Sequence, residues 1–306
     1  MRYPLKILIP IVTLAILAAG LVYAYPISAL TALFQAQLQL KQVHSETYRD
    51  VHVYRKNYCS HPEECQCVLL IHGLGDEGLT WKRVLMGEGL TSPPPSVHLF
   101  AVDLPGSGDT PALKDSHDYR ISHLARVVKD SVMDQCESWV VVGNSFGGWI
   151  AAEIALSYPT LLSGLMLENA AGLDRDYSDI LPAFVDPSPE SLREFRAKAY
   201  YNSFPVPDFI AQSAIRKFEK MPIIQMLKSQ QGGTEFLDHR IKQIRMPTAL
   251  LWGDSDRIIP LDHGIEFANA IPQASLRVAK NCGHLPHKEC PQDFWTSFQR
   301  LLDQVQ

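Results

Sequence analysis

Three residues of this chain have the types and the order of a triad of nucleophile, acid and base: Ser145, Asp256 and His284. The serine lies in Gly-Asn-Ser-Phe-Gly, between a run of valines and an apolar segment that can form a helix. Such a turn between strand and helix holds the serine in a strained conformation that exposes its hydroxyl. Gly143 and Gly147 leave room for the tight crossing. The pattern predicts a nucleophilic serine at the end of a buried strand.

A carboxylate and a histidine follow two further predicted strands. The buried strand that begins at Thr248 ends in a turn with two carboxylates, Asp254 and Asp256, and a short strand over 275–279 precedes His284. In a triad of this kind the histidine takes the proton of the serine and returns it to the leaving group. The carboxylate holds the imidazole in the required tautomer. Both partners that the serine needs are therefore present.

A third part of the site follows the apolar run over 67–71. In acyl transfer the carbonyl oxygen gains negative charge, and loss of one N–H group that stabilises it costs about 3 kcal/mol of barrier. The N–H group of Phe146, directly after the serine, and that of Leu74, after His72 and Gly73, are the expected donors. We therefore interpret His72 as a structural residue that orders this loop.

Five motifs in one order make the chain resemble the serine α/β-hydrolases, from about Val51 to the C-terminus. The resemblance implies a mostly parallel sheet flanked by helices, with a helical cap inserted before the acid-bearing strand. It also implies that the loops after successive strands bring nucleophile, acid and histidine together. The motifs are His72-Gly73-Leu74-Gly75, Asp103-Leu104-Pro105-Gly106-Ser107-Gly108, Gly143-Asn144-Ser145-Phe146-Gly147-Gly148, Trp252-Gly253-Asp254-Ser255-Asp256 and Gly283-His284.

The resemblance also decides between neighbouring candidates. The family spacing Trp-Gly-x-x-Asp implies Asp256 as the acid, and Asp254 is then expected to bond backbone N–H groups of its turn. Gly-His followed by Glu-x-Pro implies His284 as the base, and we expect His287 to be exposed in a loop. Asp103 forms a turn in the family and takes no part in chemistry.

A narrower resemblance connects the chain to membrane-bound monoacylglycerol lipases and bacterial family V lipases and esterases. It rests on an N-terminal hydrophobic segment, on Glu168-Asn169-Ala170-Ala171-Gly172-Leu173 after a strand, on Pro187-Ser188-Pro189-Glu190 and on Asn281-Cys282-Gly283-His284. It implies lipid esters as substrates.

The predicted organisation has four parts: a membrane anchor or signal segment (1–25), an amphipathic linker helix (26–50), an α/β-hydrolase core (51–172 and 236–306) and a helical cap (173–235). In the cap, Ser188 and Pro189 begin a helix that reaches Tyr200. Further helices are predicted over 208–220 and 222–230, the last ended by two glycines. We expect most apolar cap residues to pack onto the core and the rest, including flexible methionines, to line an acyl-chain pocket.

The N-terminal segment has an apolar run from Ile7 to Ala24, preceded by Arg2 and Lys6 and followed by no basic residue until Lys41. This asymmetry predicts that the remainder is exported. We predict a membrane anchor with an extracytoplasmic catalytic domain, and cleavage near Ala24 with secretion stays open as the alternative. The segment from Ile27 to Leu40 is expected to be a helix along the membrane surface.

Composition excludes some partners. At 306 residues, 46% hydrophobic and 20% charged, with a net charge of −5, the chain has no basic excess for binding nucleic acid. No histidine spacing resembles a metal site, so no metal or cofactor is expected. Six cysteines fit an oxidising compartment: Cys59 is expected to bond Cys65 or Cys67, and Cys282 to bond Cys290 beside the histidine, with unpaired buried cysteines as the alternative. The sequence leaves the oligomeric state open.

These observations predict a serine hydrolase of carboxylic esters, with monoacylglycerols or similar medium- and long-chain lipid esters as substrates. A C–C bond hydrolase of an aromatic ring-cleavage product is the alternative, because such enzymes share Gly-Asn-Ser-x-Gly-Gly. A non-catalytic binding protein with the same fold is a third hypothesis, although a binding module has no need of an intact triad.

Overall fold

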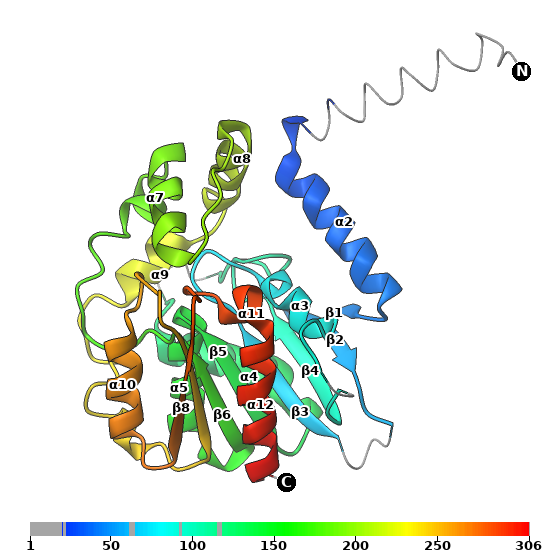
Figure 1. Ribbon diagram of the computed structural model, residues 1–306, viewed down its shortest axis with the longest axis vertical. Coiled ribbons are helices and arrows are strands. Elements are labelled where there is room, and N and C mark those ends of the chain that lie inside the picture. Colours follow the sequence, from blue (N-terminus) through cyan, green and yellow to red (C-terminus); the bar gives the residue numbers. More distant parts are fainter. Residues whose placement is uncertain (1–19, 21–22, 61–64, 92–93, 115–117, 306) are drawn as a thin grey trace, which may run out of the picture.

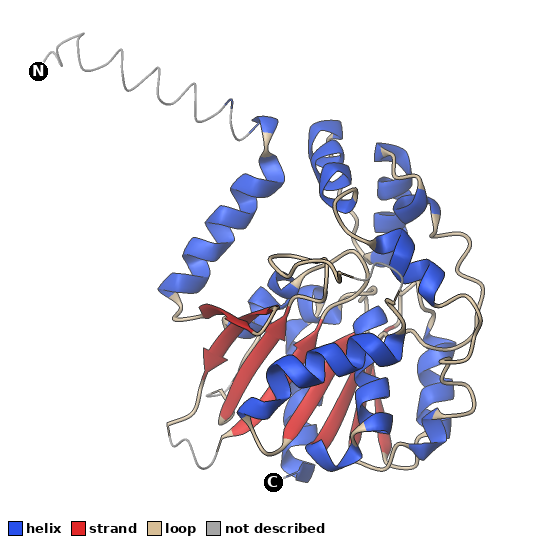
Figure 2. Cartoon of the chain, turned by 180° about the vertical axis from the view of Figure 1, so that it is seen from behind, coloured by secondary structure: helices blue, strands red, loops and turns tan. Residues whose placement is uncertain are grey.

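The structure is a computed structural model and describes residues 20, 23–60, 65–91, 94–114 and 118–305. An eight-stranded sheet in the order β1-β2-β4-β3-β5-β6-β7-β8 forms its centre. Figures 1 and 2, which are opposite views, show helices covering both faces of this sheet. The strands are β1 (His44–Tyr48), β2 (Val51–Asn57), β3 (Gln66–Ile71), β4 (Val97–Val102), β5 (Trp139–Asn144), β6 (Leu162–Glu168), β7 (Thr248–Gly253) and β8 (Ala274–Ala279).

The pairs β1–β2 and β2–β4 are antiparallel, and all other neighbouring strands run parallel. This is the α/β-hydrolase fold that the sequence predicted. The carboxyl ends of β3, β5, β6, β7 and β8 consequently lie at one edge of the sheet, where the loops that follow them carry the predicted site residues.

Helices connect most of the strands. They are α2 (Pro26–Leu40), α3 (Lys82–Leu85), α4 (Ile121–Val132), α5 (Phe146–Ser157), α6 (Pro182–Val185), α7 (Pro189–Ala199), α8 (Asp208–Phe218), α9 (Ile223–Ser229), α10 (Leu261–Ala270), α11 (Pro286–Glu289) and α12 (Pro291–Val305). Short 3₁₀ helices are η2 (Gly78–Trp81), η3 (Met133–Gln135), η4 (Pro159–Leu161) and η5 (Ile241–Gln243).

The valine-rich strands are buried on both faces of the sheet. Successive residues of β5 alternate between two apolar layers: Val141 packs in the layer that includes α4, α5 and α10, whereas Val140 and Val142 pack in the layer that includes α3 and α12. All three valines are fully buried. A parallel sheet covered by helices on both sides requires such continuous apolar runs, which explains the run before Ser145.

Four helices, α6 to α9, lie between β6 and β7, in the region predicted to form the cap. The three predicted helices are confirmed as α7, α8 and α9. The Ser188 side chain caps α7 by accepting a hydrogen bond from the backbone N–H of Ser191, and Pro189 is the first helical residue. The short helix α6 was not predicted. The boundaries between core and cap stay a prediction.

The helix predicted over 27–40 is confirmed as α2, which begins at Pro26 and has no charged residue. The prediction of a linker helix over the whole of 26–50 was wrong, because β1 (His44–Tyr48) pairs with β2. Near the C-terminal end of α2, Leu38 is buried against the core, whereas Leu30 and Leu33 are 42% and 54% exposed. At its N-terminal end Tyr23 stacks on Phe209 of α8. Within the part of the chain that the structure describes, no helix is both long enough and apolar enough to cross a membrane. Most of the predicted anchor over 7–24 lies outside the described residues.

All six cysteines are paired. Cys59–Cys65 is one of the two alternatives that the sequence offered, and Cys282–Cys290 is confirmed. The remaining bond, Cys67–Cys136, was not predicted and joins positions 69 residues apart, at the start of β3 and shortly before β5. By the loop-entropy argument a closure of that length stabilises the fold by about 4 kcal/mol.

The turn after β4 is held by a cluster of the buried His52 and Asp103 with the exposed Asp109. The Asp103 carboxylate is fully buried and accepts hydrogen bonds from the backbone N–H groups of Gly78 and Asp109, as expected of a turn residue. His52 Nδ1 lies 2.7 Å from Asp103 Oδ2, and His52 Nε2 lies 2.7 Å from Ser45 Oγ. Burial, the largest single influence, favours the neutral ring, but the hydrogen bond and charge of Asp103 outweigh it and raise the pKa of His52.

This raised pKa predicts a pH-dependent contribution to stability. A group whose pKa is higher in the folded state stabilises the fold fully below its ordinary value, which is 6.5 for His52, and loses that contribution as the pH rises through the folded-state value. The melting temperature of the wild type should therefore exceed that of His52→Gln most in mild acid, and the difference should shrink toward alkaline pH. A difference that is constant with pH would contradict this.

Candidate active site

Ser145 has the strained backbone that the motif predicted. It lies between β5 and α5 with φ 56° and ψ −121°. This backbone conformation is unfavourable for a residue that has a Cβ atom. A Cβ atom on Gly143 would come within 2.2 Å of the Gly147 carbonyl oxygen, and one on Gly147 within 2.3 Å of the Ile71 carbonyl oxygen. Both glycines are therefore required by the crossing of strand and helix, which confirms the steric interpretation of the motif.

The structure brings Asp256 and His284 together. Asp256 Oδ2 lies 2.7 Å from His284 Nδ1, and both side chains are buried. The other oxygen, Asp256 Oδ1, accepts hydrogen bonds from the N–H groups of Ile258 at 2.7 Å and Ile259 at 3.0 Å. The carboxylate is thus fixed in position with one oxygen directed at the imidazole, an arrangement that leaves Nε2 free to exchange protons.

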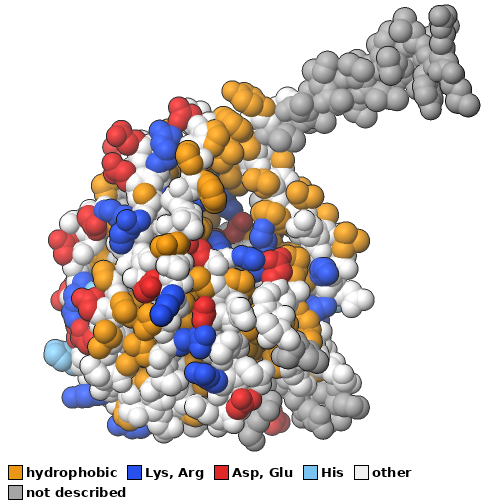
Figure 3. Space-filling view, viewed as in Figure 1, with side chains coloured by type: hydrophobic (Ala, Val, Ile, Leu, Met, Phe, Trp, Pro, Cys, Tyr) orange, Lys and Arg blue, Asp and Glu red, His pale blue; other side chains and the backbone are white. Residues whose placement is uncertain are grey.

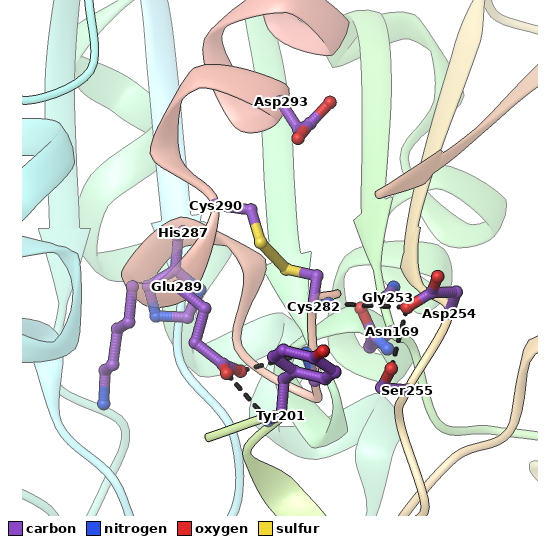
Figure 4. The surroundings of a disulfide bond; sticks show 12 residues. Asn169, Tyr201, Gly253, Asp254, Ser255, Cys282, His287, Glu289, Cys290 and Asp293 are labelled. Atoms are coloured by element: carbon purple, nitrogen blue, oxygen red, sulfur yellow. Dashed lines mark hydrogen bonds between the residues drawn. A yellow bond between two sulfur atoms is a disulfide. The ribbon is translucent and has the colours of Figure 1, made fainter. Parts of the chain in front are cut away.

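Asp254 takes the other role that the sequence offered for this turn. Its Oδ1 accepts hydrogen bonds from Ser255 Oγ at 2.8 Å and from the Cys282 N–H group at 3.4 Å. Figure 4 shows Asp254 beside Ser255 and Gly253, away from His287. This carboxylate serves the turn and does not contact His284.

Asn169 is a residue of the site that the sequence analysis did not assign. It follows β6 with φ 44°, and its side-chain amide donates a hydrogen bond to Asp256 Oδ2 while its Oδ1 accepts one from the Gly253 N–H group at 3.3 Å. The segment from Glu168 onward was noted only as a family feature. An asparagine directly after a buried strand that ends at the site was the available signal, since asparagine tolerates a left-handed backbone.

The segment that carries His284 is held from several sides. The His284 N–H group donates to the Ala199 carbonyl oxygen at the end of α7, and its carbonyl oxygen accepts a hydrogen bond from Asn144 Nδ2 at 3.0 Å. The Cys282–Cys290 bond closes the segment, and Glu289 accepts hydrogen bonds from the N–H groups of Gly283 and Tyr201 (Figure 4).

The two expected oxyanion donors line the same cavity as Ser145 and His284. Among the described residues, neither the N–H group of Leu74 nor that of Phe146 has a hydrogen-bond acceptor. Next to them, His72 is buried with Nε2 accepting a hydrogen bond from the Leu104 N–H group at 3.0 Å and Nδ1 donating to the Gly73 carbonyl oxygen at 2.7 Å. Both ring nitrogens of His72 are therefore used to order the loop.

His287 is not an exposed loop residue, and that expectation was wrong. Its side chain is fully buried, with Nδ1 2.6 Å from Glu168 Oε2 and Nε2 3.1 Å from Thr80 Oγ1. The short helix α11 turns the residue inward, under the ring of Trp81, whose centroid is 4.2 Å away. Sequence spacing alone did not reveal that a buried carboxylate was available as its partner.

The cavity that opens on Ser145 has a volume of about 620 Å³. Its walls are mostly apolar, and hydrophobic side chains gather around a hollow between the α7–α8 region and α2 (Figure 3). None of the methionines that the structure describes lines it, so the expectation of a methionine wall was wrong: Met226 packs into the core and Met221 among the helices α6 to α9. The aromatic lining residues are Phe146, Trp149, Tyr177, Phe184, Phe195, Tyr200, Phe204, Phe218 and Phe236.

Within the described part of the chain, one group of side chains has the proximity of metal ligands: His52, Asp103 and Asp109. Both nitrogens of the His52 ring and both oxygens of the Asp103 carboxylate are already engaged with protein groups. The cluster is therefore satisfied as a structural one.

The sheet order, the strained serine and the Asp–His pair together define an α/β hydrolase. Residues 68–296 match the alpha/beta hydrolase family. This match covers well over half of the chain, and the protein belongs to that family.

Two curated relatives illustrate the range of this family. The chain is 24% identical over 278 residues to the monoacylglycerol lipase ABHD6 of Homo sapiens, an alignment that covers 83% of this chain and 79% of that protein. It is 27% identical over 258 residues to a 2-hydroxy-6-oxo-6-phenylhexa-2,4-dienoate hydrolase of Comamonas testosteroni, with 76% and 85% covered. The crystal structure of a membrane phospholipase A, a bacterial virulence factor, is similar with a TM-score of 0.75, 25% identity and 98% of both chains covered.

The two carboxylates after β7 should differ sharply when each is neutralised. Asp256→Asn removes the charge that orients His284, so the rate at which a fluorophosphonate labels Ser145 should fall by about 10³- to 10⁴-fold. Asp254→Asn, the matched control, should keep the rate within about threefold because its carboxylate contacts Ser255 and the Cys282 N–H group and not the His284 side chain. Equal losses in two folded variants would contradict the assignment of the acid.

Proposed function

We propose that this protein is a serine hydrolase of carboxylic esters, and that its substrates are monoacylglycerols or similar medium- and long-chain lipid esters. The observation that carries the proposal is the apolar cavity of about 620 Å³, which Ser145, His284 and both oxyanion donors line. Pockets of this size and character bury most of a small apolar ligand. An acyl chain suits these walls, because each buried CH₂ group contributes about 0.8 kcal/mol.

In the proposed mechanism Ser145 Oγ attacks the ester carbonyl carbon while His284 Nε2 takes its proton. Asp256 holds the Nδ1–H group of the ring and stabilises the imidazolium. The N–H groups of Leu74 and Phe146 stabilise the developing oxyanion. The alcohol leaves with the proton from His284, and water then attacks the acyl-serine by the same proton transfers in reverse order.

The membrane is the proposed source of the substrate. Ile27 of α2 lines the cavity, and the uncharged helix has two half-exposed leucines, Leu30 and Leu33. Phe204, 78% exposed, is on the opposite wall of the cavity, in the connection between α7 and α8. Apolar side chains on both sides of the opening support contact with a lipid surface, with α2 in the interface plane. We further propose that the segment before α2 anchors the protein so that the catalytic part is outside the cytoplasm, or is cleaved near Ala24.

A C–C bond hydrolase is the second candidate, since the phenylhexadienoate hydrolase of Comamonas testosteroni is among the relatives. Such an acidic substrate needs a cationic partner. Arg193 and Lys288 line the cavity but are paired with Asp208 and Asp76, whereas Arg196 has a buried Nε atom without a partner. The predominance of apolar walls favours the lipid ester.

Hydrolysis of a p-nitrophenyl ester series from acetate to palmitate tests the ester specificity. The value of kcat/KM for the full chain in detergent should rise with acyl length, by up to about fourfold for each CH₂ group that the cavity buries, and reach its maximum at medium or long chains. Ser145→Ala is the control and should retain the fold without turnover. A maximum at acetate, or activity only toward a dienoate, would shift the assignment to a small-ester or C–C hydrolase.

The membrane orientation is tested by polar substitutions beside the opening. Leu33→Ser and Phe204→Ser should each reduce hydrolysis of monoacylglycerol in phosphatidylcholine vesicles by about 10- to 100-fold, because each removes about 1.5 to 3 kcal/mol of apolar burial in the lipid. Hydrolysis of soluble p-nitrophenyl butyrate should be unchanged in Leu33→Ser, because Leu33 does not line the cavity. Ile265→Ser is the matched control, since Ile265 is 47% exposed on α10 and does not line the cavity. Equal losses in all three variants would contradict the orientation.

A further inference from the structure

A chain of hydrogen bonds runs through Glu168, His287, Thr80 and Asp76, from the interior to the wall of the cavity. His287 Nδ1 lies 2.6 Å from Glu168 Oε2, and the His287 N–H group donates to Glu168 Oε1 at 2.6 Å. His287 Nε2 lies 3.1 Å from Thr80 Oγ1, and Thr80 Oγ1 donates to Asp76 Oδ2 at 2.7 Å. Lys288 Nζ donates to the same Asp76 oxygen at 2.9 Å. Glu168 and His287 are fully buried and Thr80 is nearly so.

The chain of hydrogen bonds connects three segments that carry the proposed chemistry. Glu168 ends β6, and its carbonyl oxygen accepts the hydrogen bond of the Ser145 N–H group at 3.1 Å. His287 lies three residues after His284, on the segment that the Cys282–Cys290 bond closes. Asp76 lies two residues after Leu74, and its N–H group donates to the Gly73 carbonyl oxygen at 3.2 Å. One network thus reaches the nucleophile, the base and one oxyanion donor.

The hydrogens of this network can be assigned by counting. The charge of Lys288 and the hydrogen bond of Thr80 outweigh the effect of burial, which is the largest single influence, and lower the pKa of Asp76 well below its ordinary value. Asp76 is therefore an acceptor, and Thr80 gives its single hydrogen to it. Thr80 must then accept from His287 Nε2–H. At the other side of the ring, His287 Nδ1 faces Glu168 Oε2 at 2.6 Å, so the hydrogen-bonded connection is continuous from Glu168 to Asp76.

Stability alone does not account for such a network. Taking a carboxylate and an imidazole out of water costs free energy, and apolar residues of similar volume in their place are often as stable or more so. A fully satisfied buried network does hold its members in one arrangement. Catalysis gains from that, because a displacement of about 1 Å at the reacting groups can lower a rate about 100-fold.

We propose that Glu168, His287, Thr80 and Asp76 form a positioning network that holds the His284 segment and the Leu74 loop at their working separation. Glu168, His287 and Thr80 act through these neighbours and do not line the cavity, whereas Asp76 forms part of its wall. This inference rests on the proposed serine-hydrolase function. It adds four positioning residues to the triad and the oxyanion donors.

Two substitutions remove the hydrogen bond between Thr80 and His287, one from each partner. Thr80→Val keeps the shape of the side chain and removes the hydroxyl group. His287→Asn keeps an N–H donor near the position of Nδ1 for Glu168 and removes the group at Nε2. In the full chain, each should lower kcat for a p-nitrophenyl ester by about tenfold with KM within about twofold. The double variant should lose no more than either single variant, because both remove one connection.

The controls separate positioning from stability. Thr80→Ser retains the hydroxyl group and should keep kcat near the wild-type value. Thr296→Val should also leave kcat unchanged, because the Thr296 hydroxyl, on α12, bonds only to the Gln292 carbonyl oxygen. Folded variants that melt at a lower temperature but keep the wild-type kcat would overturn the proposal, as would fully additive losses. If Thr80→Val does not fold, His287→Asn decides; if neither folds, the network serves stability and the proposal is wrong.

The rate of fluorophosphonate labelling keeps this test distinct from that of the proposed function. Labelling needs the nucleophile, the base and the oxyanion donors but no particular ester. A wild type that is labelled rapidly and hydrolyses none of the esters would refute the substrate assignment, and slower labelling of Thr80→Val would still support the network. A wild type that is not labelled would refute the serine-hydrolase function and, with it, this inference.

Discussion

The strained turn at Ser145 is the constraint on which the rest of the site depends. The serine is held at a positive φ angle because its N–H group donates to the Glu168 carbonyl oxygen and its own carbonyl oxygen accepts from Gly148 and Ala171. The bonds with Glu168 and Ala171 come from β6 and from the segment that follows it, so the turn is supported by the neighbouring strand as well as by α5. A strained conformation persists only where its surroundings determine it more than once. The central place of β5 in the sheet provides those surroundings.

The histidine segment shows a second kind of support, in which the helices over the site contribute directly to it. The Ala199 carbonyl oxygen at the end of α7 accepts from the His284 N–H group, and the neighbouring Lys198 carbonyl oxygen accepts from the Arg257 N–H group beside Asp256. The end of one helix therefore contacts both the base segment and the acid turn. Because α7 also lines the cavity, the same element shapes the substrate wall and the positions of the catalytic groups under the proposed function.

The charged groups beside the cavity are satisfied within the protein. The cavity in front of Ser145 is mostly apolar, Asp76 and Lys288 of its wall form an ion pair, and Glu168 and His287 are paired with each other in the interior. This arrangement lets an apolar chain bind without leaving a buried charge unpaired, which would cost far more than the chain gains. The exposed leucines of α2 continue the apolar surface outward from the cavity.

The sequence by itself determined the features whose cause is local. The strand–turn–helix at Ser145 follows from two glycines without room for a Cβ atom, and α7 begins where a serine cap precedes a proline. Motif order was enough to predict the fold, and capping residues and terminal glycines predicted the helices α7 to α9. The positions of the cysteines predicted Cys282–Cys290 and, among two alternatives, Cys59–Cys65. Motif spacing also placed Asp256, rather than Asp254, opposite His284, although the catalytic roles of both remain a prediction.

Only the tertiary structure decided the features that need a partner far away in the chain. His287 is buried because Glu168, at the end of another strand, accepts its hydrogen bonds, and nothing in the residues around His287 indicates that partner. Asn169 reaches Asp256, and Cys67 finds Cys136, only after the parallel strands are aligned. Met226 lies in the short helix α9, and its residue type alone does not show whether it faces the core or the cavity. Pairing across the sheet, which depends on strand order and register, is the physical reason for the difference.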